Sequence, residues 1–374
     1  ILSAINLWDN IIGWEQELMG IEDVRPTQVN NHLFAISPEG AYMWASDYRI
    51  AFVYTYLENI LLYDKVMSAK DNAWGPAHEI GHIHQLAIDW PSSTESSNNL
   101  FSNFILYKLG KYCSRGTELN LPKAADNRTT NSEGNITGMT LSEAHCVLNR
   151  PWCNFGSNYQ GENTELHMRM NWQLWNYYHR CGHKTDFWQR LFKLMRENRT
   201  SSNNPGVKQL LFARMASEAA QEDLTEFFEM WGFFVTVDTQ IDQYGSYTVT
   251  KEMIENAKKA MAKYPKKAKP FYYLEDRKKG DIGLDTTPPD VGHYTQFQRI
   301  RPITKDIKGN INGREVSITN GDEAVAFELR EKDANGKLLY FSTFIKFEVP
   351  LTVSLTYAKL YAVQADGKRI LLEE

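Results

Sequence analysis

The feature that most constrains this chain is the stretch WGPAHEIGHIHQ, residues 74–85, which holds three histidines and a glutamate within seven residues. In a helix, His78 and His82 lie one turn apart and about 40° apart around the axis, so both imidazoles can reach one metal ion. Glu79 is offset by about 100° and can contact a water beside that ion. The stretch therefore predicts a catalytic zinc site with His78 and His82 as ligands and Glu79 as general base.

Matches to this spacing are often accidental, and the alternative is an exposed helix that binds no metal. Two features favour the metal site. Ile80 and Ile83 supply an apolar face. Gly81 costs about 1 kcal/mol relative to alanine in a helix, which predicts close packing against another segment. His84 points to a different side of the helix, so we expect it to support the fold, and we expect the same of Gln85.

A catalytic zinc usually has a third protein ligand, and the stretch TESSNN offers Glu95 at the start of a helical segment. Asn99 lies four residues further on, on the same face, and is a candidate for orienting a zinc-bound imidazole from outside the ligand shell. Trp74 and Trp90 flank the metal helix and are candidates for binding a sugar ring of a substrate, although Trp is more often a core residue. The segment AYMWASDYRI, residues 41–50, is either an edge strand that pairs with a substrate backbone or a core strand.

The pattern along the chain predicts the α+β class. Helical periodicity dominates the first two thirds, and a polar stretch at residues 114–140 is predicted to be a surface loop. Charge, proline and glycine cluster at residues 264–295, as in a linker. The pattern then alternates as in strands, with Asn-Gly and Asp-Gly turn signals. We therefore predict a first domain over residues 1–295 and a small all-β sandwich domain over residues 296–374.

Composition argues against several classes of partner. The net charge of −5 gives no electrostatic case for binding nucleic acid or an anionic membrane. No apolar run has the length of a transmembrane segment, and no signal segment is visible in this chain. None of the four cysteines forms a CxxC pair, which argues against a thiolate zinc site. Cys146 and Cys153 flank a short loop and are candidates for a disulfide, with buried free thiols as the alternative.

Four blocks of the sequence resemble, in this order, the enhancin-like zinc metallopeptidases: WGPAHEIGHIHQ, TESSNNLFS, MNWQLWNYYHRCGHKTDFWQRLF and DLTEFFEMWGF. That family includes viral enhancins and mucin-directed proteases of gut bacteria, and the resemblance covers about residues 2–274. It implies Zn²⁺ held by His78, His82 and Glu95, with Glu79 as general base. It also implies a gluzincin-like fold, in which a mixed sheet and an active-site helix precede a helical subdomain. Secretion or display on a bacterial cell surface is implied as well.

The leading hypothesis is a zinc endopeptidase that cleaves O-glycosylated proteins such as mucins, with Glu79 as general base. One alternative is a zinc peptidase without glycan dependence. The other is a glycan- or protein-binding adhesin module on a protease scaffold, against which the intact Glu79 argues. A residue that stabilises the oxyanion is also needed, and the sequence leaves Tyr159, His145, His167 and His179 open. The oligomeric state is not predicted.

Overall fold

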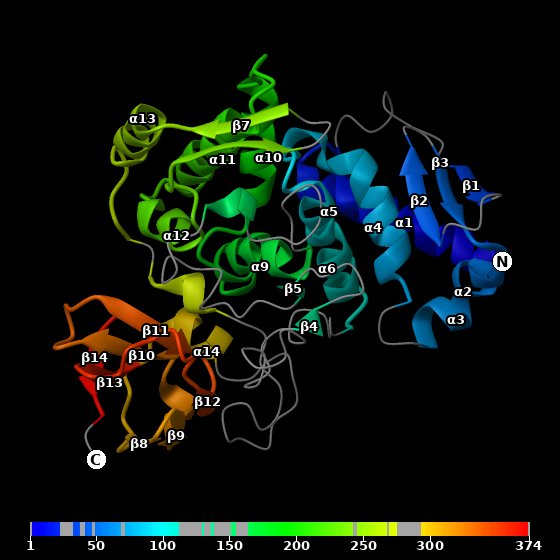
Figure 1. Cartoon of the computed structure of the whole chain (residues 1–374). Helices are drawn as coiled ribbons and strands as arrows, with labels where there is room; N and C mark the ends of the chain where they lie inside the picture. Colours follow the sequence, from blue (N-terminus) through cyan, green and yellow to red (C-terminus); the bar gives the residue numbers. More distant parts are fainter. Residues whose placement is uncertain are drawn as a thin grey trace.

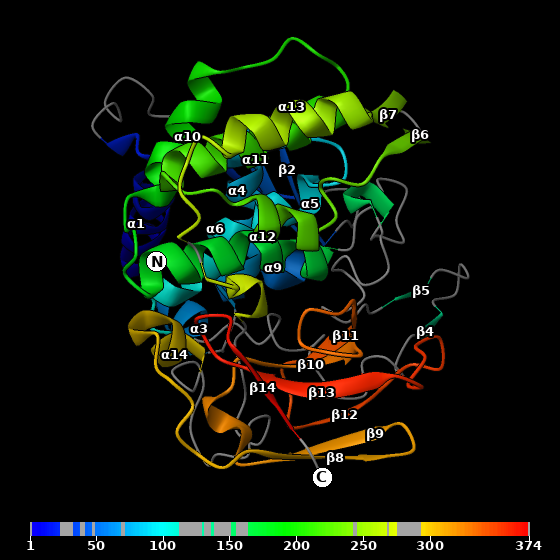
Figure 2. The same cartoon turned by 90° about the vertical axis from the view of Figure 1, so that its left-hand side faces the viewer.

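The computed structural model describes residues 2–22, 33–37, 42–46, 49–68, 72–111, 129–130, 136–137, 151–154, 164–241, 245–267, 269–274 and 293–372. In Figure 1 the chain runs from an N-terminal part with a small sheet (blue), through a helical part (green), to a β unit (orange to red). Figure 2 shows the β unit on one side of the helices. The combination of helices and separate sheets confirms the predicted α+β class.

The N-terminal part combines a long helix, a mixed sheet and the helix of the HEIGH motif. Its elements are α1 (Leu2–Met19), β1 (Leu33–Ile36), β2 (Met43–Ser46), β3 (Arg49–Phe52), α2 (Leu57–Leu61), α3 (Tyr63–Ser68), α4 (Trp74–His84), α5 (Thr94–Ser97) and α6 (Asn99–Lys108). β1 pairs in parallel with β3, and β3 pairs antiparallel with β2, in the order β1-β3-β2. β3 is central and its Ile50, Ala51 and Phe52 are fully buried, whereas β2 is an edge strand of this sheet and packs against α4.

The helical part lies on the side of the N-terminal helices that is turned away from the three-stranded sheet (Figure 1). Its elements are α9 (Thr164–Trp175), which continues into a π-helical turn (Asn176–Arg180), α10 (Phe187–Glu197), α11 (Pro205–Ala220), α12 (Thr225–Met230), β6 (Val237–Ile241), β7 (Gly245–Val249) and α13 (Lys251–Met261). Local chemistry sets the ends of α11: the Asn204 side chain accepts from the Gly206 amide, Pro205 opens the helix, and Gln221 closes it in the left-handed region. Within the predicted loop at 114–140, a short antiparallel pair is described, and the rest lies outside the described residues. That pair is β4 (Thr129–Thr130) and β5 (Ile136–Thr137).

The C-terminal unit is a β-sandwich, as predicted. Its strands are β8 (Lys308–Asn312), β9 (Glu315–Thr319), β10 (Ala326–Glu331), β11 (Leu338–Ser342), β12 (Lys346–Glu348), β13 (Ala358–Val363) and β14 (Arg369–Leu371). The helix α14 (His293–Arg299) precedes them and packs against the π-helical turn of the helical part. The strand orders are β11-β10-β13-β14 and β12-β9-β8, all antiparallel. The two sheets share an apolar core that includes Val316, Phe327 and Phe347. The predicted division between residues 295 and 296 falls within α14 and stays a prediction.

One large apolar core joins α4 to the helical part and reaches the face of the four-stranded sheet that is turned away from the other sheet. The β unit contributes Val325, Ala326, Phe341, Val363 and Ala365 to this core. At the same interface Tyr273, in a short turn after α13, donates a hydrogen bond to the Glu328 carboxylate on β10. Glu328 is fully buried and also accepts from Arg330 and Arg369. The β unit is therefore held to the helical part by apolar contact and by the hydrogen bond from Tyr273 to Glu328, whose two arginine partners belong to the β unit itself.

Two of the cysteines fall within the described residues. Cys153 and Cys181 are both buried, and burial raises the pKa of each thiol to about 12. Neither is therefore a reactive thiolate near neutral pH. Cys113 and Cys146 lie outside the described residues, so the pairing of Cys146 with Cys153 stays a prediction.

Candidate metal centre

The helix α4 is held by close contacts on two sides. Towards the junction of α5 and α6, a Cβ at Gly81 would lie 2.9 Å from the carbonyl oxygen of Asn98. Only a glycine lets the two backbones approach so closely, which confirms the close packing predicted from its presence. Towards the core, Ile80 is fully buried, and His84 Nδ1 lies 2.7 Å from Oε2 of Glu15 on α1. His84 therefore ties two helices together and faces away from the other two histidines.

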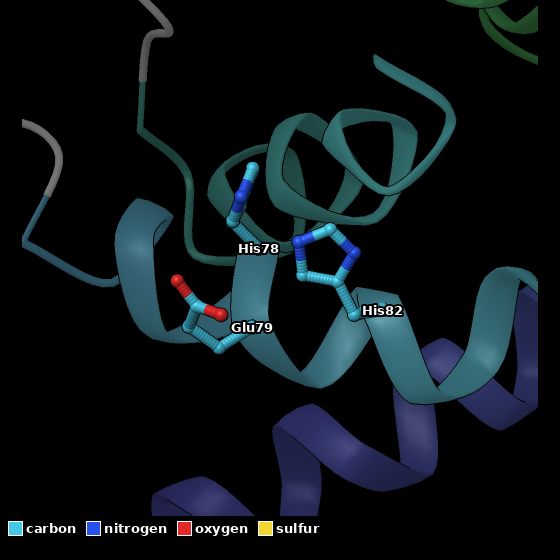
Figure 3. Close-up of side chains that lie close together, drawn as sticks. All are labelled: His78, Glu79 and His82. Carbon is cyan, nitrogen blue, oxygen red and sulfur yellow. The ribbon is translucent and has the colours of Figure 1, made fainter. Parts of the chain in front are cut away.

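His78 and His82 project from neighbouring turns of α4, with Glu79 beside them (Figure 3). One ligand atom from each of these three side chains lies within 4.8 Å of the other two. Oε2 of Glu95, on α5, lies 3.4 Å from Nε2 of His78 and 3.6 Å from Nε2 of His82. Ligand atoms about 2.0–2.2 Å from one tetrahedral zinc are ~3.3–3.6 Å apart, so these side chains fit such an ion.

The two glutamates near the histidines have opposite electrostatic surroundings. Burial raises the pKa of Glu79 to about 7; His78 opposes this shift and Glu95 adds to it. A carboxyl with a pKa near the operating pH suits general acid–base catalysis. Hydrogen bonds with His78 and His82 hold the pKa of Glu95 well below its usual value, despite partial burial. Glu95 is thus a permanent carboxylate, as a metal ligand needs to be, whereas Glu79 can exchange a proton.

The outer nitrogen of His78 contacts a carboxamide. Its Nδ1 lies 2.5 Å from Oδ1 of Asn99, and Asn99 Nδ2 donates to the backbone oxygen of Glu95 at 2.8 Å. Asn99 thereby connects His78 to the helix that carries Glu95. The structure places Asn99 where a residue that orients the imidazole would lie.

The outer nitrogen of His82 also contacts a carboxamide, that of Gln85. The sequence predicts only a role in the fold for Gln85. His82 Nδ1 lies 2.9 Å from Nε2 of Gln85, and Ser97 Oγ donates to Oε1 of Gln85 at 2.5 Å. On the other side of the ring, Nδ2 of Asn98 lies 3.0 Å from His82 Nε2. The available signal for Gln85 was its spacing of three residues from His82, which brings the two side chains together on one helix face.

The histidines and glutamates open into a cavity of about 770 Å³. The edge strand β2 forms one wall, and α4 with the start of α5 forms the other. Trp44 and Leu86 add apolar surface to these walls and Asp89 adds a carboxyl group. Residues 41–50 therefore hold both an edge strand that lines the cavity, β2, and the start of the buried central strand β3, and pairing of β2 with a substrate backbone stays a prediction.

The burial of Trp74 and Trp90 argues against the sugar-binding roles predicted for them. Their side chains are buried, with 6% and 1% of their surface exposed, and neither lines the cavity. Trp74 stacks on His78 with ring centroids 5.3 Å apart, and Trp90 packs against Phe212 in the core. The position of a tryptophan next to the metal helix in the sequence therefore does not show whether its side chain is buried in the core or exposed at the cavity. The tryptophan that lines the cavity is Trp44, which the sequence had not singled out.

The four predicted oxyanion donors divide into two groups. His167 is fully buried and its Nδ1 lies 3.0 Å from the Ser92 carbonyl oxygen. His179 stacks on a core tryptophan, and neither histidine lines the cavity. Tyr159 and His145 lie outside the described residues. The structure therefore argues against His167 and His179 as oxyanion donors and leaves Tyr159 and His145 as candidates.

Two family models match the chain. "Peptidase M60, enhancin and enhancin-like" matches residues 2–232, which is more than half of the chain. "Peptidase M60 C-terminal domain" matches residues 306–371, the region of the β-sandwich. The metal-site helix, α5 and the helical part as far as α12 therefore fall within the first model.

Solved structures agree with these matches. A metallopeptidase in complex with Tn antigen is 63% identical, has a TM-score of 0.82, and is similar over 100% of this chain and 67% of its own. A metallopeptidase from Bacteroides thetaiotaomicron is 62% identical with a TM-score of 0.81, over 100% of this chain and 61% of its own. The M60 catalytic domain of Clostridium perfringens ZmpC, in complex with the sialyl T antigen, shares the fold at 18% identity and a TM-score of 0.60, over 98% and 63% of the two chains.

Curated relatives are more distant. The TRPM8 channel-associated factor homolog of Xenopus laevis is 26% identical over 171 residues, which are 43% of this chain and 15% of that protein. TRPM8 channel-associated factor 2 of Bos taurus is 27% identical over 194 residues, 48% of this chain and 17% of that protein. The chain thus spans only a small part of these two proteins. The family models and the two structures above 60% identity carry the assignment: the chain belongs to the enhancin-like Peptidase M60 family, whose solved members include metallopeptidases.

Proposed function

We propose that this chain is a zinc endopeptidase that hydrolyses peptide bonds in O-glycosylated proteins. One observation carries the proposal: at the wall of the cavity, Oε2 of Glu95 lies within 3.6 Å of Nε2 of His78 and of Nε2 of His82. Three nitrogen and oxygen ligands leave a fourth position of a tetrahedral zinc open, as catalytic sites do, whereas structural zinc sites are usually closed by cysteine.

The chain's own residues supply the remaining chemistry. Bound zinc would polarise the peptide carbonyl and make a water molecule more acidic. Glu79, whose pKa is raised to about 7 by burial, accepts the proton of the attacking water and can then donate it to the departing amine. Its position beside His78 and His82 on the same helix keeps it within reach of that water (Figure 3).

The cavity wall suggests how a substrate would bind. Among the described strands, β2 has a neighbour on one side only, so an extended substrate backbone can pair with its free edge. Trp44 on this strand offers an aromatic ring at the cavity, in place of the two buried tryptophans. The 63% identical metallopeptidase was solved with Tn antigen, which supports a glycan-bearing substrate for this chain.

A mucin-type substrate places the reaction outside the cell. We therefore propose a secreted or cell-surface bacterial enzyme. Within the described residues, no helix combines the length and the apolar character that a bilayer crossing requires.

The test is digestion of one O-glycopeptide and its sugar-free twin, read by mass spectrometry, with Glu79→Gln protein alongside. We expect the glycopeptide alone to be cleaved. We expect Glu79→Gln to keep zinc and to lose about 10²–10⁴-fold in rate, the usual contribution of a general base. Retained activity in Glu79→Gln would remove Glu79 as the base.

The other outcomes separate the alternative functions. Cleavage of both peptides would make the sugar incidental and favour a general zinc peptidase. Cleavage of neither, with zinc bound, would favour a glycan- or protein-binding module on a protease scaffold.

A further inference from the structure

Both metal-facing histidines are connected to the helix that carries Glu95 by a side-chain amide. Asn99 links His78 to the backbone of Glu95. Gln85 links His82 to the side chain of Ser97 on the same helix, α5. The second partner of the Asn99 amide is a backbone carbonyl, whereas the second partner of the Gln85 amide is a hydroxyl. This difference decides which orientations each amide can adopt.

The far partner of Asn99 fixes its orientation. A backbone carbonyl can only accept a hydrogen bond, so Asn99 has to present its NH2 group to Glu95 and its oxygen to His78. The oxygen accepts a hydrogen bond from the Nδ1–H group of His78. His78 is therefore held with its proton on Nδ1 and its lone pair on Nε2, the nitrogen that faces Glu95.

The far partner of Gln85 leaves its orientation open. A serine hydroxyl both donates and accepts, so Ser97 is satisfied by either end of the Gln85 amide. Turning this amide by 180° exchanges its oxygen and its NH2 group at His82 at little cost on the Ser97 side. The choice is made at the His82 ring.

The hydrogen-bond requirements of His82 favour one orientation. NH2 groups of Gln85 and Asn98 face its two ring nitrogens, at 2.9 and 3.0 Å, but a neutral imidazole accepts at only one nitrogen. Asn98 Nδ2 also donates to the backbone oxygen of His78 at 3.3 Å, and turning Asn98 would bring two acceptors together. The amide of Gln85 is therefore the one that turns.

We propose that Gln85 is a positioning residue for the metal site. Its side-chain oxygen accepts a hydrogen bond from the Nδ1–H group of His82, and Ser97 accepts one from its NH2 group. This keeps the lone pair of His82 on Nε2, the nitrogen that faces Glu95 and that accepts from Asn98 when no metal ion is bound. With the NH2 group towards His82, the ring instead carries its proton on Nε2 and cannot bind a metal there. The proposal rests on the zinc site of the proposed function, but not on any substrate.

The test is zinc affinity, measured by competition with a chromophoric chelator, in wild type and in Gln85→Met and Gln85→Glu. Methionine fills a similar volume without an acceptor oxygen, and we expect about 10–100-fold weaker zinc binding. Glutamate keeps an acceptor, and we expect affinity within about five-fold of wild type. The matched control is Gln240→Met, which removes an exposed glutamine that donates to Ser246 at 2.7 Å, and its affinity should equal that of wild type.

A second readout follows the proton itself. In zinc-loaded protein labelled with ¹⁵N-histidine, we expect the His82 ring to carry its proton on Nδ1. Wild-type zinc affinity in Gln85→Met, equal loss in both Gln85 variants, or a proton on Nε2 of His82 would each overturn the proposal. Absence of stoichiometric zinc in wild type would instead overturn the proposed function. Thermal unfolding of the metal-free proteins shows whether each variant folds.

Discussion

Two carboxylates in this chain are each faced by two nitrogen-bearing side chains, with opposite consequences. Glu95, at the cavity, lies between two histidines and keeps 40% of its side chain exposed. Glu328, between the β unit and the helical part, lies between Arg330 and Arg369 and is fully buried. The first cluster is open and the second is closed, although each brings together side chains from different elements.

The type of nitrogen explains the difference. Arginine is always charged and only donates, so Arg330, Arg369 and Tyr273 together satisfy the oxygens of Glu328 from three directions. Histidine near neutral pH has a lone pair as well as a proton. His78 and His82 can therefore each face Glu95 with a proton on Nε2, or offer the lone pair of that nitrogen to a metal ion held beside Glu95. A closed cluster stabilises the fold, whereas an open one has capacity left for a ligand.

The largest expected effect tests the closed cluster. Glu328→Gln removes the charge of a fully buried carboxylate that faces two partly buried arginines, and breaking a buried pair in this way costs about 3–5 kcal/mol. We expect that loss in the free energy of unfolding, measured by denaturant titration, with unchanged zinc affinity. The exposed Glu255→Gln on α13 is the matched control and should change stability by less than about 0.5 kcal/mol. A loss below about 1 kcal/mol for Glu328→Gln would contradict the closed description.

The complementary change tests the open cluster. Outer-shell contacts are typically worth 10–100-fold in metal affinity, so removal of the direct ligand in Glu95→Ala should weaken zinc binding by more than about 100-fold. The unfolding free energy of the metal-free protein should change by less than about 0.5 kcal/mol, because the carboxylate is part exposed. Metal content and chelator competition measure the first quantity. Unchanged zinc content would remove Glu95 as a ligand.

A smaller effect concerns the packing that places α4 beside Glu95. Gly81→Ala gains about 1 kcal/mol of helix propensity, but its Cβ meets a backbone oxygen at 2.9 Å, and overpacking costs about 1–3 kcal/mol. We expect a lower melting temperature and weaker zinc binding. Gly75→Ala in the same helix would meet only the flexible end of Met43 and should not lower the melting temperature. Equal behaviour of the two variants would show that the approach at Gly81 is not tight.

The smallest effect is a pH dependence of the closed cluster. Burial alone would raise the pKa of Glu328, but hydrogen bonds from Arg330, Arg369 and Tyr273 outweigh it and leave the pKa below the ordinary 4.5. Its contribution to stability is therefore complete above pH 4.5 and is lost as the pH falls through the lowered pKa. The difference in unfolding free energy between wild type and Glu328→Gln should shrink between pH 6 and pH 3. A constant difference would show that Glu328 is not preferentially ionised in the fold.

The sequence alone determined those parts of the site that depend on one helix. The spacing of His78 and His82 fixes their common direction in any α-helix, and Glu79 follows from the same geometry. The presence of Gly81 in the helix predicted that another segment packs closely against it, and the structure shows this contact with Asn98. The β-sandwich was also predictable, because alternation and turn residues are local signals.

Only the tertiary structure decided which groups from other segments meet these side chains. Trp74 and Trp90 are buried while Trp44 lines the cavity, and a tryptophan's own sequence neighbours do not reveal which of its faces is covered. The contact of Gln85 with Ser97 and the cluster around Glu328 each join segments that are distant in the chain. The physical reason is that helix periodicity fixes directions within an element, whereas partners across elements are selected by packing of the whole core.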